Sequence, residues 1–298
     1  MAYNKTPMAM TLLATAMASA LIMTPATADD AFFEALTGGK VSFSARARYE
    51  NVDQDGISEE ANAFTVRTTL GYKTGLFHGF GGFVEMEDVS ELGSEQYNDT
   101  SNGRVQYPVV VDPKGTEVNQ AYLFYTDGTN DIKFGRQEIT FRKAPFHRFV
   151  GNVLWRQNHQ SYDGLRLSSN AIADVTLDYA YINKINSIFG DEKNVGIFDD
   201  GVVDVSGHLF NAEYKGLGIG TVSAYAHLVD YKELESISNK IIGARLSGAQ
   251  AVSDDFKVIY TAEYAQQDDY KDGSQEDHNY YLAEVGGEVQ RLVSKSVS

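Results

Sequence analysis

The chain has 298 residues, a formal net charge of -16 at pH 7 and no cysteine. The acidic balance excludes nucleic acid as a partner, because its phosphates would be repelled. The lack of cysteine excludes disulfide bonds and thiolate metal sites. In chain order, an export signal comes first, and segments of β-strand character fill the remainder.

The first 28 residues have the order of features that is typical of a secretory signal peptide. A short polar stretch with one lysine precedes the uncharged apolar run 8–23, and Ala26 and Ala28 form a small-residue cleavage site. The apolar run is short for a membrane helix, which needs about 20 residues, although a retained anchor is the alternative. We therefore expect residues 1–28 to be removed and residues 29–298 to form one exported domain.

From residue 40 onwards, apolar and polar residues alternate in segments of roughly ten residues. In residues 40–50, Val41 and Phe43 lie on one side of the alternation, and Arg46 and Arg48 lie on the other. About ten residues is the length of a tilted strand that spans a membrane. The predicted strands are residues 40–50, 63–74, 78–89, 118–126, 131–141, 160–168, 173–183, 207–215, 218–231, 240–248, 255–266 and 278–287.

The connections between these segments alternate between short and long. Short connections contain turn residues, as at 127–128 and 215–216, whereas long connections such as 90–116 and 184–206 are acidic and polar. A membrane barrel has this asymmetry, with tight periplasmic turns and long external loops. A soluble sandwich, the alternative all-β fold, has no physical reason for it. We therefore predict an all-β, antiparallel up-and-down transmembrane β-barrel of about 12 or more strands, located in the outer membrane.

Charge decides which face of each strand meets lipid. An arginine on the lipid face costs roughly 2–4 kcal/mol at the bilayer midplane, so the face that carries Arg46 and Arg48 must line the lumen. By the same argument, Arg67 faces the lumen together with Thr65 and Thr69. The apolar faces are left for contact with outer-membrane lipid and lipopolysaccharide, with tyrosine and phenylalanine as an aromatic girdle near the strand ends.

Residues 142–159 form the third long connection and contain Trp155, the only tryptophan. In porins, this loop folds into the barrel and narrows the pore. Residues 131–166 hold seven basic and three acidic side chains, although the whole chain is acidic. A charged ring in a narrow lumen selects ions by sign, so we expect a pore that prefers anions. The candidate pore-lining or solute-contacting residues are Arg46, Arg48, Arg67, Lys133, Arg136, Arg142, Arg148, Arg156, Arg166 and Trp155.

Several short motifs in the middle of the chain resemble one known family. They are Val118-Asn119-Gln120-Ala121-Tyr122, Lys133-Phe134-Gly135-Arg136-Gln137-Glu138, residues 151–158 (GNVLWRQN) and Tyr162-Asp163-Gly164. In these motifs the chain resembles the alginate-export-type outer-membrane porins, and the resemblance extends over residues 40–287. The resemblance implies an arginine-lined lumen through which an anionic small solute or a polyuronate passes.

Two features depart from the pattern of that family. Its members usually have more strands, and proteins of this class usually end in a strand with a terminal aromatic residue. Residues 288–298 (EVQRLVSKSVS) do not have that ending. We therefore expect the C-terminal end of the barrel to be incomplete, as in a truncated member of the family.

Other roles remain open for the same residues. Lumen arginines opposite Glu85, Glu87 and Asp163 would brace the wall by neutralising these carboxylates, which is the alternative to solute contact. An outer-membrane barrel enzyme of lipase or protease type would need a nucleophile and a base, but His159 next to Ser161 matches no nucleophile motif. The acidic loop 268–273 lacks the spacing of a calcium-binding EF-hand.

A structural or adhesive barrel without a conducting pore is the third class, and a filled lumen would distinguish it. We predict that the chain is not an enzyme and uses no cofactor or metal. Its predicted function is passive diffusion of hydrophilic, preferentially anionic solutes across the outer membrane, which the protein reaches by export through the periplasm.

Overall fold

The chain enters the sheet through a short helix, α2 (Asp30–Thr37). The amide of Gly75, in the first short turn, donates to the carbonyl of Ala35 over 2.8 Å. Within the part of the chain described below, no helix is long and apolar enough to cross a membrane. The predicted signal peptide, residues 1–28, lies outside the described residues. The computed structural model describes residues 30–142, 148–190, 195–275 and 277–289.

Twelve strands among the described residues form one antiparallel sheet, in which each strand pairs with its neighbours in sequence. This confirms the predicted strand number, the antiparallel order and the up-and-down connections. The strands are β1 (Lys40–Val52), β2 (Ala61–Lys73), β3 (Phe80–Glu91), β4 (Gly115–Thr126), β5 (Asn130–Gln137), β6 (Ser161–Ser169), β7 (Val175–Asn186), β8 (Val202–Leu217), β9 (Gly220–Tyr231), β10 (Asn239–Ser253), β11 (Phe256–Asp269) and β12 (His278–Val289), with a 3-10 turn, η1 (Glu235–Ile237), between β9 and β10.

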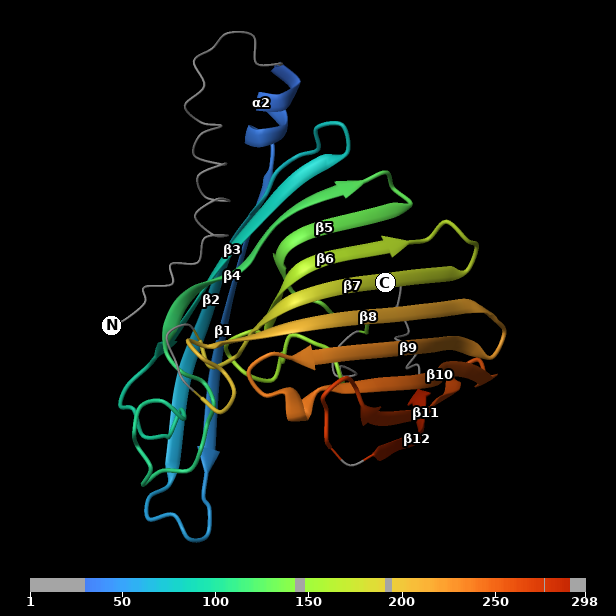
Figure 1. Ribbon diagram of the computed structural model, residues 1–298. Helices are drawn as coiled ribbons and strands as arrows, with labels where there is room; N and C mark the ends of the chain where they lie inside the picture. The colour runs from blue at the N-terminus through green and yellow to red at the C-terminus, as the bar shows by residue number, and fades with distance from the viewer. Residues whose placement is uncertain (1–29, 143–147, 191–194, 276, 290–298) are drawn as a thin grey trace, which may run out of the picture.

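The sheet curves strongly, and the space on its concave side is the lumen. In Figure 1, β1 to β4 stand steeply at one side, and β5 to β12 are stacked beside them. Within the described residues, the two outermost strands are each paired on one side only, β1 with β2 and β12 with β11.

The connections alternate between short and long, as the sequence predicts. Residues 170–174 and 218–219 are short turns, whereas residues 92–114 and 138–160 are long connections at the other end of the sheet. We call residues 92–114 the second long loop and residues 138–160 the lumen loop. One predicted strand, 131–141, ends earlier, at Gln137, because the chain leaves the sheet there to enter the lumen loop.

The facing of the strands follows the predicted alternation, because successive side chains of a strand point to opposite faces. On β2, Phe64 and Leu70 are exposed on the outer face, and Leu70 keeps 56% of its surface accessible. Thr65 and Arg67 are buried on the inner face of the same strand. This arrangement confirms that the basic face lines the lumen and that the apolar face points outward.

Candidate pore and its constriction

The lumen loop folds into the concave side of the sheet and contacts strands that are far apart. At one end of its course, Nη1 of Arg46 on β1 donates to the carbonyls of Leu154 and Arg156, at 2.7 and 2.9 Å. At the other end, Nη2 of Arg142 donates to Oε1 of Glu263 on β11 over 2.9 Å. The described parts of the predicted loop, Arg142 and residues 148–159, therefore lie on the inner side of the sheet and contact strands on both sides of the lumen.

Gln157 is the centre of the attachment to β1 and β2. It is fully buried, and its Nε2 donates to the hydroxyl of Thr65 over 2.9 Å and to the carbonyl of Thr65 over 3.1 Å. Its backbone N–H donates to Oδ1 of Asp112 in the second long loop, 3.0 Å away. A loop inside a lumen must satisfy its polar groups, and here the strand accepts from the side-chain amide of Gln157 while the neighbouring loop accepts from its backbone N–H.

His159 links the same part of the loop to β2 and β3. Its Nδ1 lies 2.6 Å from Oε2 of Glu87, and its Nε2 lies 2.6 Å from Nη1 of Arg67. Because the guanidinium can only donate, Nε2 is the acceptor in this contact, while Nδ1 lies within ion-pair distance of Glu87 and, at 3.3 Å, of Glu138. Both ring nitrogens of His159 are therefore occupied by partners other than Ser161, which gives no support to a catalytic pair.

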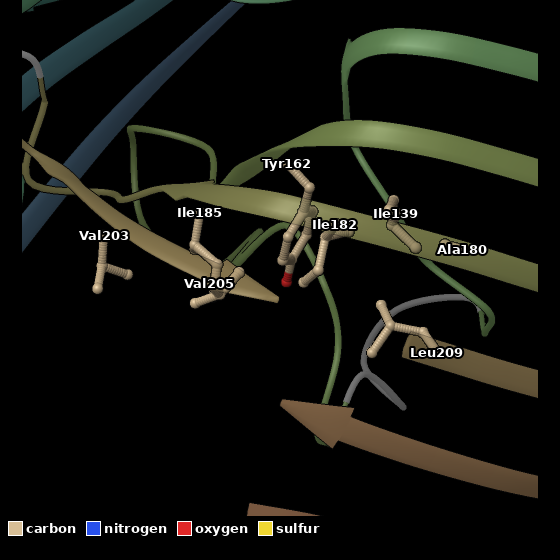
Figure 2. Close-up of a cluster of buried hydrophobic side chains, with 8 residues drawn as sticks. All are labelled: Ile139, Tyr162, Ala180, Ile182, Ile185, Val203, Val205 and Leu209. Carbon is tan, nitrogen blue, oxygen red and sulfur yellow. The ribbon is translucent and has the colours of Figure 1, made fainter. Parts of the chain in front are cut away.

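An apolar cluster attaches the lumen loop to the middle of the sheet. Ile139 from the loop packs with side chains of β6, β7 and β8, and Phe141 and Val150 pack against the same cluster. The hydroxyl of Tyr162 donates to the carbonyl of Gly151 over 3.0 Å. This packing fills the inner side of the sheet there. Figure 2 shows the buried members, Ile139, Tyr162, Ala180, Ile182, Ile185, Val203, Val205 and Leu209.

A cavity of about 1060 Å³ remains between the lumen loop and strands β8 to β12. The loop contributes Phe141, Arg142 and Leu154 to its lining, and the strands contribute hydroxyl groups. The charged side chains in the lining are Arg142, Lys215, Arg245, Glu213 and Glu284, so cations outnumber carboxylates by three to two. The hydroxyl-bearing residues of the lining that face it from the strands include Thr221, Ser223, Ser247 and Thr261.

Most of the predicted lumen arginines form ion pairs with the wall or the loops. Arg48 contacts Asp112 at 2.8 Å, and Arg166 contacts Asp178 at 2.8 Å. Two further pairs are Arg67 with Glu87 at 4.0 Å and Arg156 with Glu50 at 3.3 Å. These contacts are the bracing arrangement that the sequence left open as an alternative to solute contact.

Three lumen cations have a different environment. Nζ of Lys133 lies 4.6 Å from the ring centre of Tyr122, and Nζ of Lys73 lies 4.7 Å from that of Phe124. Arg46 donates to neutral carbonyls of the lumen loop. Among the described residues, no carboxylate lies within 4.0 Å of the charged nitrogens of these three side chains. Their positive charge is therefore not cancelled by a direct partner.

Arg136 has the same parity on β5 as Ile132 and Phe134, which are exposed on the outer face. Its own side chain is only 11% exposed, and its Nε donates to Oδ1 of Asp163 on β6 over 2.9 Å. Lys133 and Arg136 are three positions apart, so a strand must place them on opposite faces. The charged pair lies at the end of β5 that leads into the long connection.

The remaining predicted residues lie on the lumen loop. The guanidinium carbon of Arg148 lies 4.8 Å from the ring centre of Tyr280 on β12. Trp155 keeps 58% of its surface exposed, as an accessible aromatic side chain on the loop. Sequence reasoning missed Arg245 and Glu263, although both occupy the polar side of predicted strands. Their alternation was a signal of lumen facing, but nothing in the sequence connects Glu263 with Arg142.

In the described parts of the chain, no group of three or more histidine, aspartate or glutamate side chains is placed to hold a metal ion. Residues 40–183 match the model of the alginate export family. No curated protein matches the chain.

Several solved structures have a similar fold. OccAB4 from Acinetobacter baumannii aligns with a TM-score of 0.66 and 14% identity, covering 85% of this chain and 65% of that chain. A BenF-like porin from Pseudomonas fluorescens Pf-5 aligns with a TM-score of 0.63 and 13% identity, covering 85% and 65%. OccK2 (OpdF) from Pseudomonas aeruginosa, in complex with glucuronate, aligns with a TM-score of 0.60 and 14% identity, covering 86% and 62%.

This chain spans less than two thirds of the length of each of those proteins. At such low sequence identity, the similarity concerns the fold. By the match over residues 40–183 the chain is similar to the alginate export family, and its fold is that of the outer-membrane β-barrel porins.

Proposed function

We propose that this protein is an outer-membrane pore for the passive diffusion of hydrophilic, preferentially anionic solutes. The observation that carries the proposal is the cavity beneath the lumen loop. Its lining combines an excess of cations with strand hydroxyl groups, and the lumen loop contributes Phe141, Arg142 and Leu154 to it. A small hydroxylated carboxylate has the charge and the hydrogen-bonding groups that match such a lining.

Lys73 and Lys133, on the opposite wall, also favour anions over cations. Both ammonium groups lie over aromatic rings, and neither has a carboxylate within ion-pair distance among the described residues. In a narrow lumen with low-dielectric walls, such charges raise the local concentration of anions. One similar structure, OccK2, was solved with glucuronate, which is a hydroxylated carboxylate of the class that we propose.

Planar-bilayer recording of the refolded protein tests this function. We expect a steady ohmic conductance and a reversal potential in a salt gradient that shows preference for anions. Lys133→Glu should shift the reversal potential towards cations, because it reverses a charge on the lumen face. Lys240→Glu is the matched control, since Lys240 lies at the other end of the sheet and pairs with Asp268 at 3.6 Å.

The control should move the reversal potential much less than Lys133→Glu. An inserted protein that conducts no current would instead support a structural barrel. Equal shifts from the two variants would show that the lumen charge does not control selectivity.

A further inference from the structure

Glu263 lies at the centre of a buried polar cluster between the lumen loop and the sheet. Its carboxylate accepts hydrogen bonds from Arg142 at 2.9 and 3.1 Å, from Arg245 at 2.9 Å and from the hydroxyl of Tyr225 at 2.6 Å. Only 5% of the residue is exposed. The three donors come from the loop, from β10 and from β9, so one carboxylate joins three elements.

The charged groups of this cluster do not all reach the cavity. Arg142 and Arg245 line the cavity, whereas Glu263 is not part of the lining and lies behind them. A solute in the cavity therefore meets two guanidinium groups, and the carboxylate that holds them in place is hidden. The guanidinium carbon of Arg142 also lies 4.9 Å from the ring centre of Tyr225, which fixes its orientation further.

Removing the carboxylate would leave two like charges side by side without their shared partner. Breaking one side of a buried ion pair is strongly unfavourable, because an uncompensated charge remains. Arg245 is held on the rigid strand β10, directly opposite Glu263 in register. Arg142 is on the loop, so it is the group that can move away, and the loop would move with it.

We propose that Glu263 is a positioning residue for the pore: it holds the lumen loop across the passage and keeps Arg142 at the edge of the cavity. It thereby controls both the width of the constriction and the strength of anion selectivity. This inference rests on the proposed function, since it names the residue that adjusts the same pore. We call the contact between Glu263 and Arg142 the tether, and it joins two residues that are 121 positions apart in sequence.

Two substitutions separate the two effects of Glu263. Glu263→Gln and Arg142→Met both break the tether, so both should increase open-channel current noise and mean conductance. Their effects on charge are opposite. Glu263→Gln removes a negative charge and should raise the anion-over-cation permeability ratio by about twofold, whereas Arg142→Met removes a cation and should lower it by about the same factor.

Glu213→Gln is the matched control. Glu213 lines the same cavity and pairs with Lys215 at 3.5 Å, and among the described residues this ion-pair partner on its own strand is the only one. This variant should raise the permeability ratio without added noise. The inference is wrong, and the loop is held by other contacts, if the open-channel current noise of Glu263→Gln is no higher than that of Glu213→Gln. The same conclusion follows if Arg142→Met does not increase the noise.

Hydrogen exchange tests the tether independently of conduction. In folded protein, confirmed by its mobility in unheated gels, backbone amides of residues 148–157 should exchange faster in Glu263→Gln and Arg142→Met than in the unmodified chain and in Glu213→Gln. Unchanged exchange would overturn the tether. If the unmodified protein does not conduct but the exchange result holds, the proposed function fails while the structural role of Glu263 stands.

Discussion

Tyr97 shows how one residue links the second long loop to the rest of the protein. Its side chain is fully buried with Ala61, Ala63 and Val110, and its hydroxyl donates to the carbonyl of Asp112 over 3.1 Å. Burial raises the pKa of Tyr97 above its ordinary value, and the nearby carboxylates, Glu91 first, add to the rise. The folded protein therefore favours the neutral phenol.

A raised pKa of a tyrosine makes the loop sensitive to alkali. The stabilisation is fully present below the pKa of an unfolded tyrosine, about 10, and it is lost as the pH rises through the higher pKa of the folded state. We expect the second long loop to become accessible to protease above about pH 10. Tyr97→Phe should reduce that sensitivity, while Tyr107→Phe in the same loop should retain it. Identical alkaline profiles for the two variants would contradict the prediction.

At the scale of a single element, β10 shows how alternate side chains of one strand face the lipid and the lumen. Leu246 pairs with Val222 and Ala262 on the outer face, while the adjacent Ser247 pairs with Thr221 and Thr261 and lines the cavity. Both positions are in the middle of the strand. They therefore differ in the face on which they lie and hardly at all in depth.

Arginine at these two neighbouring positions should have very different effects. Leu246→Arg places a charge against lipid near the midplane and should cost roughly 2–4 kcal/mol of folding free energy in bilayers. Ser247→Arg points into a water-filled cavity and should cost much less. Urea titration of folding into lipid vesicles measures both values. Similar losses for the two variants would show that the facing assigned to β10 is wrong.

At the scale of the whole molecule, β1 and β12 are the two outer strands of the curved sheet that the described residues form. Ala45 on β1 and Ala283 on β12 both lie on the outer face, since they pair with the outer-face residues Thr68 and Ala262. In the hydrocarbon region, every backbone polar group must find a partner within protein. A lipid-exposed strand edge does not meet that requirement.

If the barrel of the 298-residue chain closes on itself, β1 and β12 lie side by side in the inserted protein. The chain has no native cysteine, so Ala45→Cys with Ala283→Cys provides a unique pair for a short bis-maleimide cross-linker. The expected product is an internally linked monomer with altered gel mobility. A linked dimer would show instead that two copies share one pore wall. Ala45→Cys with Ala212→Cys, on the distant strand β8, is the control that should not link.

The sequence by itself determined the strands, their order and their facing. Lipid tolerates apolar side chains and penalises arginine, so an alternating segment such as 40–50 has one physically acceptable orientation. The same rule, applied strictly, separates Lys133 from Arg136, because residues three apart on a strand cannot share a face. Charge alone does not make that separation. The inward fold of residues 142–159 was also predictable, from the resemblance to porins.

Only the tertiary structure decided which lumen charges are available to a solute. Arg142 pairs with Glu263 over 121 positions of sequence, and Arg48 pairs with Asp112 over 64. Such pairs arise because the curved sheet brings distant strands to one lumen, where desolvated charges require close partners. A local count of basic residues cannot include partners from elsewhere in the chain. For that reason the sequence indicated that the pore would prefer anions, whereas the three-dimensional pairing determined which basic side chains remain available to produce that preference.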